Sequence, residues 1–241
     1  MDMLRLAAVL AAILSGTEML AAAALPAIKA SPGNSVPACV TPQRLTEFLK
    51  SRNDHLPTAF EGLAAQYERY GRTLGLRWDY AFFQMVVETN WLRYRTGSGR
   101  AGLVSPRQNN FAGIGATGRG HSGEAFPDPS LGVLAHLQHV AMYAGETIER
   151  PVATRTRLVQ GWGEIPHWAH EFRRPVTFTD LTRKWSPRDR GYSDDIAAVA
   201  ERFYTHHCDV RIAANTAAPT LAPDPAPTGS IRTSLFRKLM F

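Results

Sequence analysis

The sequence predicts a single α+β domain that is mostly helical, and three observations support this. Apolar residues recur with a helical period through most of the stretch from residue 41 to residue 204. Residues 97–129, the glycine-rich segment, hold eight glycines, which disfavour helix and favour short strands or a hairpin. The chain has 241 residues, enough for one good-sized core, and 44% of them are hydrophobic, as in soluble globular proteins. We expect helices to form the body and the glycine-rich segment to form a small β-lobe.

One helix is predicted at the centre of this domain. Residues Tyr80–Trp91 read YAFFQMVVETNW and are apolar nearly all the way round, which is typical of a helix buried on every side. Asp79 is the expected N-cap, and the helix is expected to span 79–92. Gln84 and Glu88 lie one turn apart and therefore share a face. The pattern places two polar side chains inside the core.

Glu88 is the candidate catalytic residue on this helix. Apolar neighbours disfavour the charged form of a carboxyl group, and a carboxyl that keeps its proton suits a general acid. The alternative is a structural ion pair, for which the sequence offers Arg93, Arg95 and Arg100 as partners. The sequence of this helix alone favours neither the general acid nor the structural ion pair.

The other helices are predicted from their end signals. Thr41 and Pro42 open the first, as N-cap and first helical residue. Asp128 or Ser130 caps a longer helix that runs through Tyr143. The remaining predicted elements are a helix over 58–74, short helices and loops within 151–190, and a last helix over 193–204.

The N-terminus has the pattern of a secretory signal peptide over residues 1–24. Arg5 precedes an apolar run, and alanines near Ala24 provide a cleavage site, although an ordinary N-terminal helix is the alternative. Residues 25–38 are rich in Pro, Ser and Gly and are expected to be a linker. The net charge of +6 suits an anionic polymer or surface as partner. We therefore expect an exported protein in the periplasm or outside the cell.

The chain has two cysteines, Cys39 and Cys208, which lie at the two edges of the predicted domain. In an exported protein such a pair favours a disulfide, whereas two unrelated buried thiols are the alternative. Metal-binding cysteine motifs are missing, and His136 and His139, three residues apart, are more typical of hydrogen-bonded helix residues. We expect no metal and no cofactor.

Residues 210–241 are predicted to be a disordered Ala/Pro-rich tail. The tail ends in SIRTSLFRKLMF, a short basic amphipathic piece that could make a weak contact with a membrane or a protein partner. A frayed terminus is the alternative. Lys and Arg do not form a stripe interleaved with aromatic residues, so we expect no nucleic acid partner.

Four stretches taken together resemble the glucosaminidase family of lysozyme-like peptidoglycan hydrolases, which includes flagellar rod-cap muramidase-type proteins and autolysin catalytic domains. The resemblance extends over about residues 40–207 and implies a catalytic domain at 39–209. It also implies a lysozyme-like helical fold with the β-lobe beside the cleft. This sequence has Leu92, Ala112 and Gly115 where the family commonly has glycine, an aromatic residue and lysine. The four stretches are QMVVETNW (84–91), NNFAGIGA (109–116), FPDPSLGVLAHLQHVAMYA (126–144) and KWSPRDRGYSDDIAAVAERFY (184–204).

The resemblance also implies roles for individual residues. The family's catalytic glutamate falls on Glu88, and its cleft tyrosine falls on Tyr192. The family's second carboxylate comes from the β-lobe, where the candidates are Glu124, which we prefer, and Asp128, which also fits a helix cap. The residues expected to bind substrate are Gln84, Trp91, Asn109, Asn110 and Asp128.

The resemblance implies an exported hydrolase that cuts β-1,4 bonds of the peptidoglycan glycan strand, of the endo-β-N-acetylglucosaminidase type. Such cleavage needs an acid to protonate the leaving oxygen and a group that stabilises the oxocarbenium-like centre. Two alternatives stay open. One is a lytic transglycosylase or muramidase on the same core, and the other is an inactive module that binds or assembles the cell wall.

Overall fold

The computed structural model describes residues 24–117 and 120–208. The signal peptide expected at 1–24, apart from Ala24, and the tail expected at 210–241 lie outside these residues. The described part is mostly helical, which confirms the helix-rich class predicted from the sequence. Its elements are α1 Pro42–Lys50, η1 Thr58–Phe60, α2 Leu63–Thr73, α3 Trp78–Thr89, η2 Pro106–Gln108, α4 Pro129–Tyr143, α5 Thr154–Trp162, α6 Glu164–His170, α7 Phe178–Trp185 and α8 Tyr192–His207.

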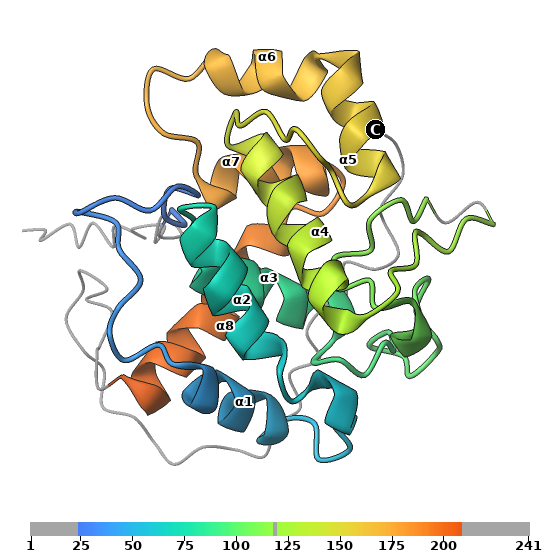
Figure 1. The fold of residues 1–241 in the computed structure, drawn as a ribbon. Coiled ribbons are helices and arrows are strands. Elements are labelled where there is room, and N and C mark those ends of the chain that lie inside the picture. The colour runs from blue at the N-terminus through green and yellow to red at the C-terminus, as the bar shows by residue number, and fades with distance from the viewer. Residues whose placement is uncertain (1–23, 118–119, 209–241) are drawn as a thin grey trace, which may run out of the picture.

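Helix α3 lies in the middle of the molecule (Figure 1). It packs against α2 and α4 on one side and against α8 on the other, while α5 and α6 pack on α4. This position explains the all-round apolar sequence of α3, because a helix enclosed by neighbours has no face for water. The central helix predicted from the sequence is therefore confirmed, although it ends at Thr89 and not at residue 92.

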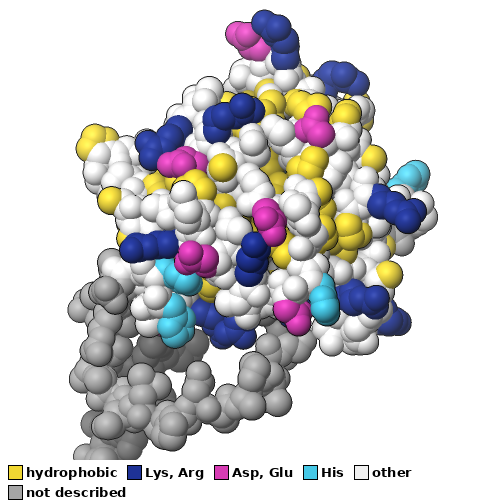
Figure 2. All heavy atoms as spheres, turned by 60° about the horizontal axis from the view of Figure 1, so that its bottom comes forward, with side chains coloured by type: hydrophobic (Ala, Val, Ile, Leu, Met, Phe, Trp, Pro, Cys, Tyr) yellow, Lys and Arg dark blue, Asp and Glu magenta, His cyan; other side chains and the backbone are white. Residues whose placement is uncertain are grey.

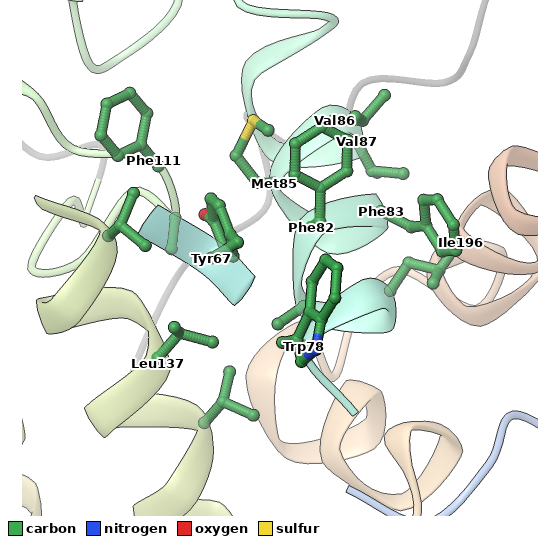
Figure 3. Packing of buried hydrophobic residues seen from close by; sticks show 14 of the residues in the cluster. Tyr67, Trp78, Phe82, Phe83, Met85, Val86, Val87, Phe111, Leu137 and Ile196 are labelled. Carbon is green, nitrogen blue, oxygen red and sulfur yellow. The ribbon is translucent and has the colours of Figure 1, made fainter. Parts of the chain in front are cut away.

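The side chains of α3 fill the core on several sides of the helix (Figure 3). Phe82, Phe83 and Met85 are fully buried, and Phe83 lies beside Ile196 of α8. Burial of each such side chain stabilises the fold by about 1.5–3 kcal/mol. Helix α2 approaches closely at Gly71, where an added Cβ would lie 2.1 Å from the Cβ atom of Trp78.

Asp79 does not cap α3, contrary to the sequence-based prediction. The N-cap position belongs to Arg77, and Asp79 lies in the first turn, where its two oxygens accept hydrogen bonds of 2.9 and 2.6 Å from the Arg77 guanidinium. The Tyr204 hydroxyl of α8 donates to the same carboxylate. Burial, followed by the charge of Asp79, raises the pKa of Tyr204, which keeps it a donor. Asp79 therefore joins α3 to α8 instead of capping a helix.

Two other predicted spans differ from the structure. The helix expected over 58–74 is divided into η1 and α2, with Gly62 between them. Residues 25–38, expected to be a linker, lie against the domain: Ile28 is fully buried, and isolated β-bridges join Ala27 to Thr177 and Lys29 to Leu76. Leu25 and Ile28 provide the apolar anchors that hold this segment in place.

The glycine-rich segment forms no regular strand in the part that the structure describes. It holds the short helix η2 and the isolated bridge from Ala116 to Ser122, and its Ala101 bridges to Arg95 just before the segment. Hydrogen bonds from side chains take the place of a strand ladder here. The Asn110 side chain, for example, donates to the Ile114 carbonyl oxygen and accepts from the Ile114 N–H group. The segment therefore consists of loops that are held together by hydrogen bonds from side chains to the backbone.

The expected disulfide joins Cys39, just before α1, to Cys208, just after α8, with 5.3 Å between the Cα atoms. The two ends of the helical body are thus linked. Within 24–117 and 120–208, no helix has the length and apolar character needed to cross a membrane. On the face drawn in Figure 2, Lys and Arg side chains are scattered among Asp and Glu.

Candidate functional site

Glu88 lies in the last turn of α3, and its side chain is held by two other helices. Its Oε1 atom accepts a 2.7 Å hydrogen bond from the Trp185 indole N–H at the end of α7. The same oxygen accepts a 2.5 Å hydrogen bond from the Tyr192 hydroxyl at the start of α8. Glu88 is 1% exposed. A buried carboxyl group is therefore oriented by two donors from distant parts of the chain.

Gln84 lies one turn earlier on the same face of α3, as the spacing predicts. Its Nε2 atom donates a 3.0 Å hydrogen bond to the Tyr192 hydroxyl, and its Oε1 atom lies 3.2 Å from Nε2 of His136 on α4. Gln84 and Glu88 thus meet at one tyrosine. The structure brings together three residues that the sequence selected: Gln84, Glu88 and Tyr192.

Tyr192 is the first residue of α8 and is fully buried. Burial raises the pKa of its hydroxyl well above the ordinary value, and the charge and hydrogen bond of Glu88 raise it further. The group therefore stays protonated at physiological pH. It serves as a hydrogen-bond donor to Glu88, and it does not form a phenolate nucleophile.

Trp185 and His136 are site residues that the sequence did not single out for this role. The Trp185 ring packs against Tyr143 and His139. Its indole N–H, however, reaches Glu88. The sequence signal that could have identified His136 was its position on the apolar face of α4, because a buried histidine must find hydrogen-bond partners.

The chain turns sharply directly after α3. Asn90, Trp91, Leu92 and Tyr94 have φ angles of 47°, 61°, 60° and 54°, in the left-handed region that costs about 1–2 kcal/mol per residue outside glycine. Thr89 holds the turn, because its hydroxyl oxygen accepts from Leu92 N–H and its carbonyl oxygen from Tyr94 N–H. A strained turn next to a buried acid is a feature seen at functional sites.

Trp91, expected to bind substrate, is a core residue in the structure. It is 4% exposed, and its ring packs edge-on against Phe48 of α1. Its backbone carbonyl accepts a 2.8 Å hydrogen bond from Asn53. Through these contacts Trp91 holds the turn after α3 in place.

The two asparagines expected to bind substrate hold the glycine-rich segment together. Asn110 is fully buried, and its amide donates to the carbonyl oxygens of Ile114 and Glu124, both at 2.9 Å. Asn109 donates a 3.0 Å hydrogen bond to the Phe126 carbonyl oxygen. Both side chains therefore bind backbone.

The candidate second carboxylates, Glu124 and Asp128, both lie at helix N-termini. The oxygens of half-buried Glu124 accept from the backbone N–H groups of Thr154 and Arg155, at 2.8 and 2.6 Å, in the first turn of α5. Asp128 is the N-cap of α4 and accepts from Leu131 N–H at 2.8 Å. Both carboxylates therefore accept hydrogen bonds from backbone N–H groups that have no partner within their own helix.

Two of the three arginines offered by the alternative interpretation of Glu88 have backbone partners. Arg93 donates to the Arg52 carbonyl oxygen, and Arg95 donates to the Gly99 carbonyl oxygen at 2.9 Å. Among the described residues, no group of three or more His, Cys, Asp or Glu side chains could hold a metal ion.

Comparison with known proteins gives one partial similarity. The chain is 32% identical over 127 residues to an uncharacterized protein of Borreliella burgdorferi (strain ATCC 35210 / DSM 4680 / CIP 102532 / B31), a match that covers 52% of this chain and 53% of that protein. The chain thus spans about half the length of this curated relative. No family model matches the chain. No solved structure matches it either.

Proposed function

We propose that this protein is an exported peptidoglycan hydrolase that cuts β-1,4 glycosidic bonds of the glycan strand, with Glu88 as general acid. The observation that carries the proposal is the 2.5 Å hydrogen bond from Tyr192 to Glu88. The resemblance places the family's catalytic glutamate and its cleft tyrosine on these two residues, which lie 104 positions apart. Their direct contact supports the assignment of both residues to one site.

The chemistry of the site agrees with this role. A glycosidase acid must deliver a proton to the leaving oxygen, and positioned acids accelerate such steps about 10²–10⁴-fold. Trp185 and Tyr192 fix the orientation of the Glu88 carboxyl at a buried position. Because Glu88 is 1% exposed, cleavage requires that the glycan gain access to this carboxyl.

The turn after α3 gives further support to the resemblance and to the lysozyme-like assignment. Leu92 occupies a position where the family commonly has glycine, and its φ angle of 60° lies in the region that favours glycine. The same backbone conformation would explain that preference. The proposed fold is therefore a lysozyme-like helical domain whose β-lobe is reduced to the tied loops of the glycine-rich segment.

The disulfide supports the proposed location. A Cys39–Cys208 bridge suits an oxidising compartment such as the periplasm or the extracellular space, where peptidoglycan is accessible.

A second candidate is a lytic transglycosylase or muramidase on the same core. The observation that favours it is the engagement of both Glu124 oxygens by the backbone of α5. A route with one essential carboxyl group needs no second carboxylate. The two candidates yield different ends: an anhydro-muramyl end marks a transglycosylase, and a reducing N-acetylglucosamine end marks a glucosaminidase.

The test is a digest of purified peptidoglycan sacculi with wild type and with Glu88→Gln, followed by mass spectrometry of the new ends. We expect wild type to release muropeptides and Glu88→Gln to lose at least about 100-fold in rate, because the amide cannot donate the acidic proton. Exposed Glu149 provides the matched control, and Glu149→Gln should retain wild-type activity.

Thermal unfolding and sacculus binding should be measured on the same proteins. If wild type binds sacculi but releases nothing, the inactive wall-binding module replaces the hydrolase. If Glu88→Gln is folded and releases muropeptides at the wild-type rate, Glu88 is not the acid.

A further inference from the structure

A chain of hydrogen bonds runs through the core and ends at Glu88. The Tyr67 hydroxyl of α2 lies 2.8 Å from Nδ1 of His136 on α4, and Nε2 of His136 lies 3.2 Å from Oε1 of Gln84. Nε2 of Gln84 lies 3.0 Å from the Tyr192 hydroxyl, which lies 2.5 Å from Oε1 of Glu88. All five side chains are buried.

The direction of donation can be assigned along this chain. The Gln84 amide donates through Nε2 to Tyr192, so its Oε1 atom faces His136 and needs a donor there. A neutral imidazole has one N–H and one acceptor nitrogen: a hydrogen on Nε2 donates to Gln84 and leaves Nδ1 to accept from Tyr67. Burial raises the pKa of Tyr67 well above its ordinary value, which keeps its hydroxyl a donor.

We propose that His136 is a positioning residue for the candidate acid: as the neutral Nε2–H tautomer, it orients the Gln84 amide and thereby directs the Tyr192 hydroxyl hydrogen toward Glu88. The physical reason is the asymmetry of the amide group. With the amide reversed, its oxygen would face Tyr192 and compete with Glu88 for the hydroxyl hydrogen. The catalytic part of this inference rests on the proposed function.

The first experiment detects the tautomer directly. Two-bond ¹H–¹⁵N correlation spectra of wild type with ¹⁵N-labelled histidine at pH 7 distinguish protonated from unprotonated ring nitrogens, and the His136 signals are those missing from His136→Gln. We expect a protonated Nε2 and an unprotonated Nδ1. An Nδ1–H tautomer or an imidazolium at this residue would overturn the proposal.

The second experiment compares two substitutions of His136 in the sacculus digest. In His136→Gln the side-chain amide nitrogen lies near the place of Nε2 and can donate to Gln84, whereas His136→Leu offers no donor. We expect His136→Leu to lower kcat at least about tenfold with little change in KM, and His136→Gln to restore most of it. Exposed His170→Gln is the control and should match wild type.

The outcomes separate this inference from the proposed function. If wild type cleaves glycan but folded His136→Leu and His136→Gln have the same kcat, the positioning role is wrong and the hydrolase stands. If wild type cleaves nothing, the proposed function and the catalytic part of this inference both fail. The wild-type spectrum then decides whether the Nε2–H chain exists, and it decides this also where His136→Leu does not fold.

Discussion

Glu88 accepts hydrogen bonds from two donors that are remote in sequence, Trp185 and Tyr192. Both donors reach the same oxygen, so the plane of the carboxyl group is set by the relative placement of α3, α7 and α8. Both donors are neutral groups, and they orient the acid without supplying a positive charge.

Tyr192→Phe tests this arrangement at a single atom. The change removes the donor to Glu88 and leaves the Gln84 amide N–H without its acceptor. We expect a kcat about 10²-fold lower and a free energy of unfolding about 1–3 kcal/mol lower, the cost of a buried polar group without its partner. The measurements are muropeptide release and urea unfolding.

Tyr70→Phe is the matched control, because the partly buried Tyr70 hydroxyl lies 2.9 Å from the Ser130 hydroxyl on the surface between α2 and α4. It should leave kcat unchanged. An equal loss of activity in both variants would mean that Tyr192 acts through stability alone.

At the scale of elements, two helix starts were predicted correctly from local caps. Thr41 caps α1 and Asp128 caps α4, as expected from residues adjacent in the chain. Helix α5 differs, because its N-cap residue, Ala153, has no side-chain acceptor and its first N–H groups bind Glu124 from the glycine-rich segment. A cap that comes from about thirty residues away leaves no local sequence signal.

Glu124→Gln distinguishes a cap from a second catalytic carboxylate. We expect activity close to wild type and a loss of about 1 kcal/mol in the free energy of unfolding, because the amide keeps one acceptor oxygen and loses the charge that suits a helix N-terminus. Urea unfolding and the sacculus digest measure the two effects. A loss of activity above about 100-fold at unchanged stability would make Glu124 the second carboxylate.

Through the Asp180 carboxyl group of α7, the helix that carries Trp185, the stability of the protein depends on pH. Burial by itself would raise the pKa of the Asp180 carboxyl, but hydrogen bonds from Arg174 and Thr177 outweigh it and lower the pKa to about 2, from an ordinary value of 3.8. A folded-state pKa below the unfolded value stabilises the protein above the unfolded pKa. This contribution is present above about pH 4 and is lost as the pH falls toward 2.

Asp180→Asn should therefore lower stability at pH 7 and flatten the loss of stability between about pH 4 and pH 2. Urea midpoints measured across this range provide the test. Asp54, whose side chain is 82% exposed, gives the control variant Asp54→Asn, which should retain the wild-type pH profile. Identical profiles for wild type and Asp180→Asn would contradict the assignment.

At the scale of the whole molecule, two features connect distant parts of the helical body. The segment before α1 packs through Ile28 and pairs with residues near α7, and the Cys39–Cys208 bridge joins the two ends across 169 positions. A bridge over so long a loop restricts the unfolded chain far more than the folded one. The bridge is therefore expected to act chiefly on stability.

Removal of the disulfide in Cys39→Ser/Cys208→Ser should lower the free energy of unfolding by up to about 4–5 kcal/mol, with activity retained at low temperature. Urea unfolding with and without a reductant measures this. The reductant should lower the stability of wild type to that of the double variant and leave the variant unchanged. A reductant effect of equal size on both proteins would show that it acts elsewhere.

The sequence by itself determined the helix-rich class, the central position of α3 and the shared face of Gln84 and Glu88, and it favoured the pairing of the two cysteines. These follow from periodicity, local capping and composition, which depend on neighbours in the chain. Tertiary structure alone decided that Asp79 pairs with Arg77, that Glu124 caps α5, and that Trp185 and His136 join the site. Such partners are chosen by how helices pack, and side chains about a hundred residues apart meet only after the core has formed.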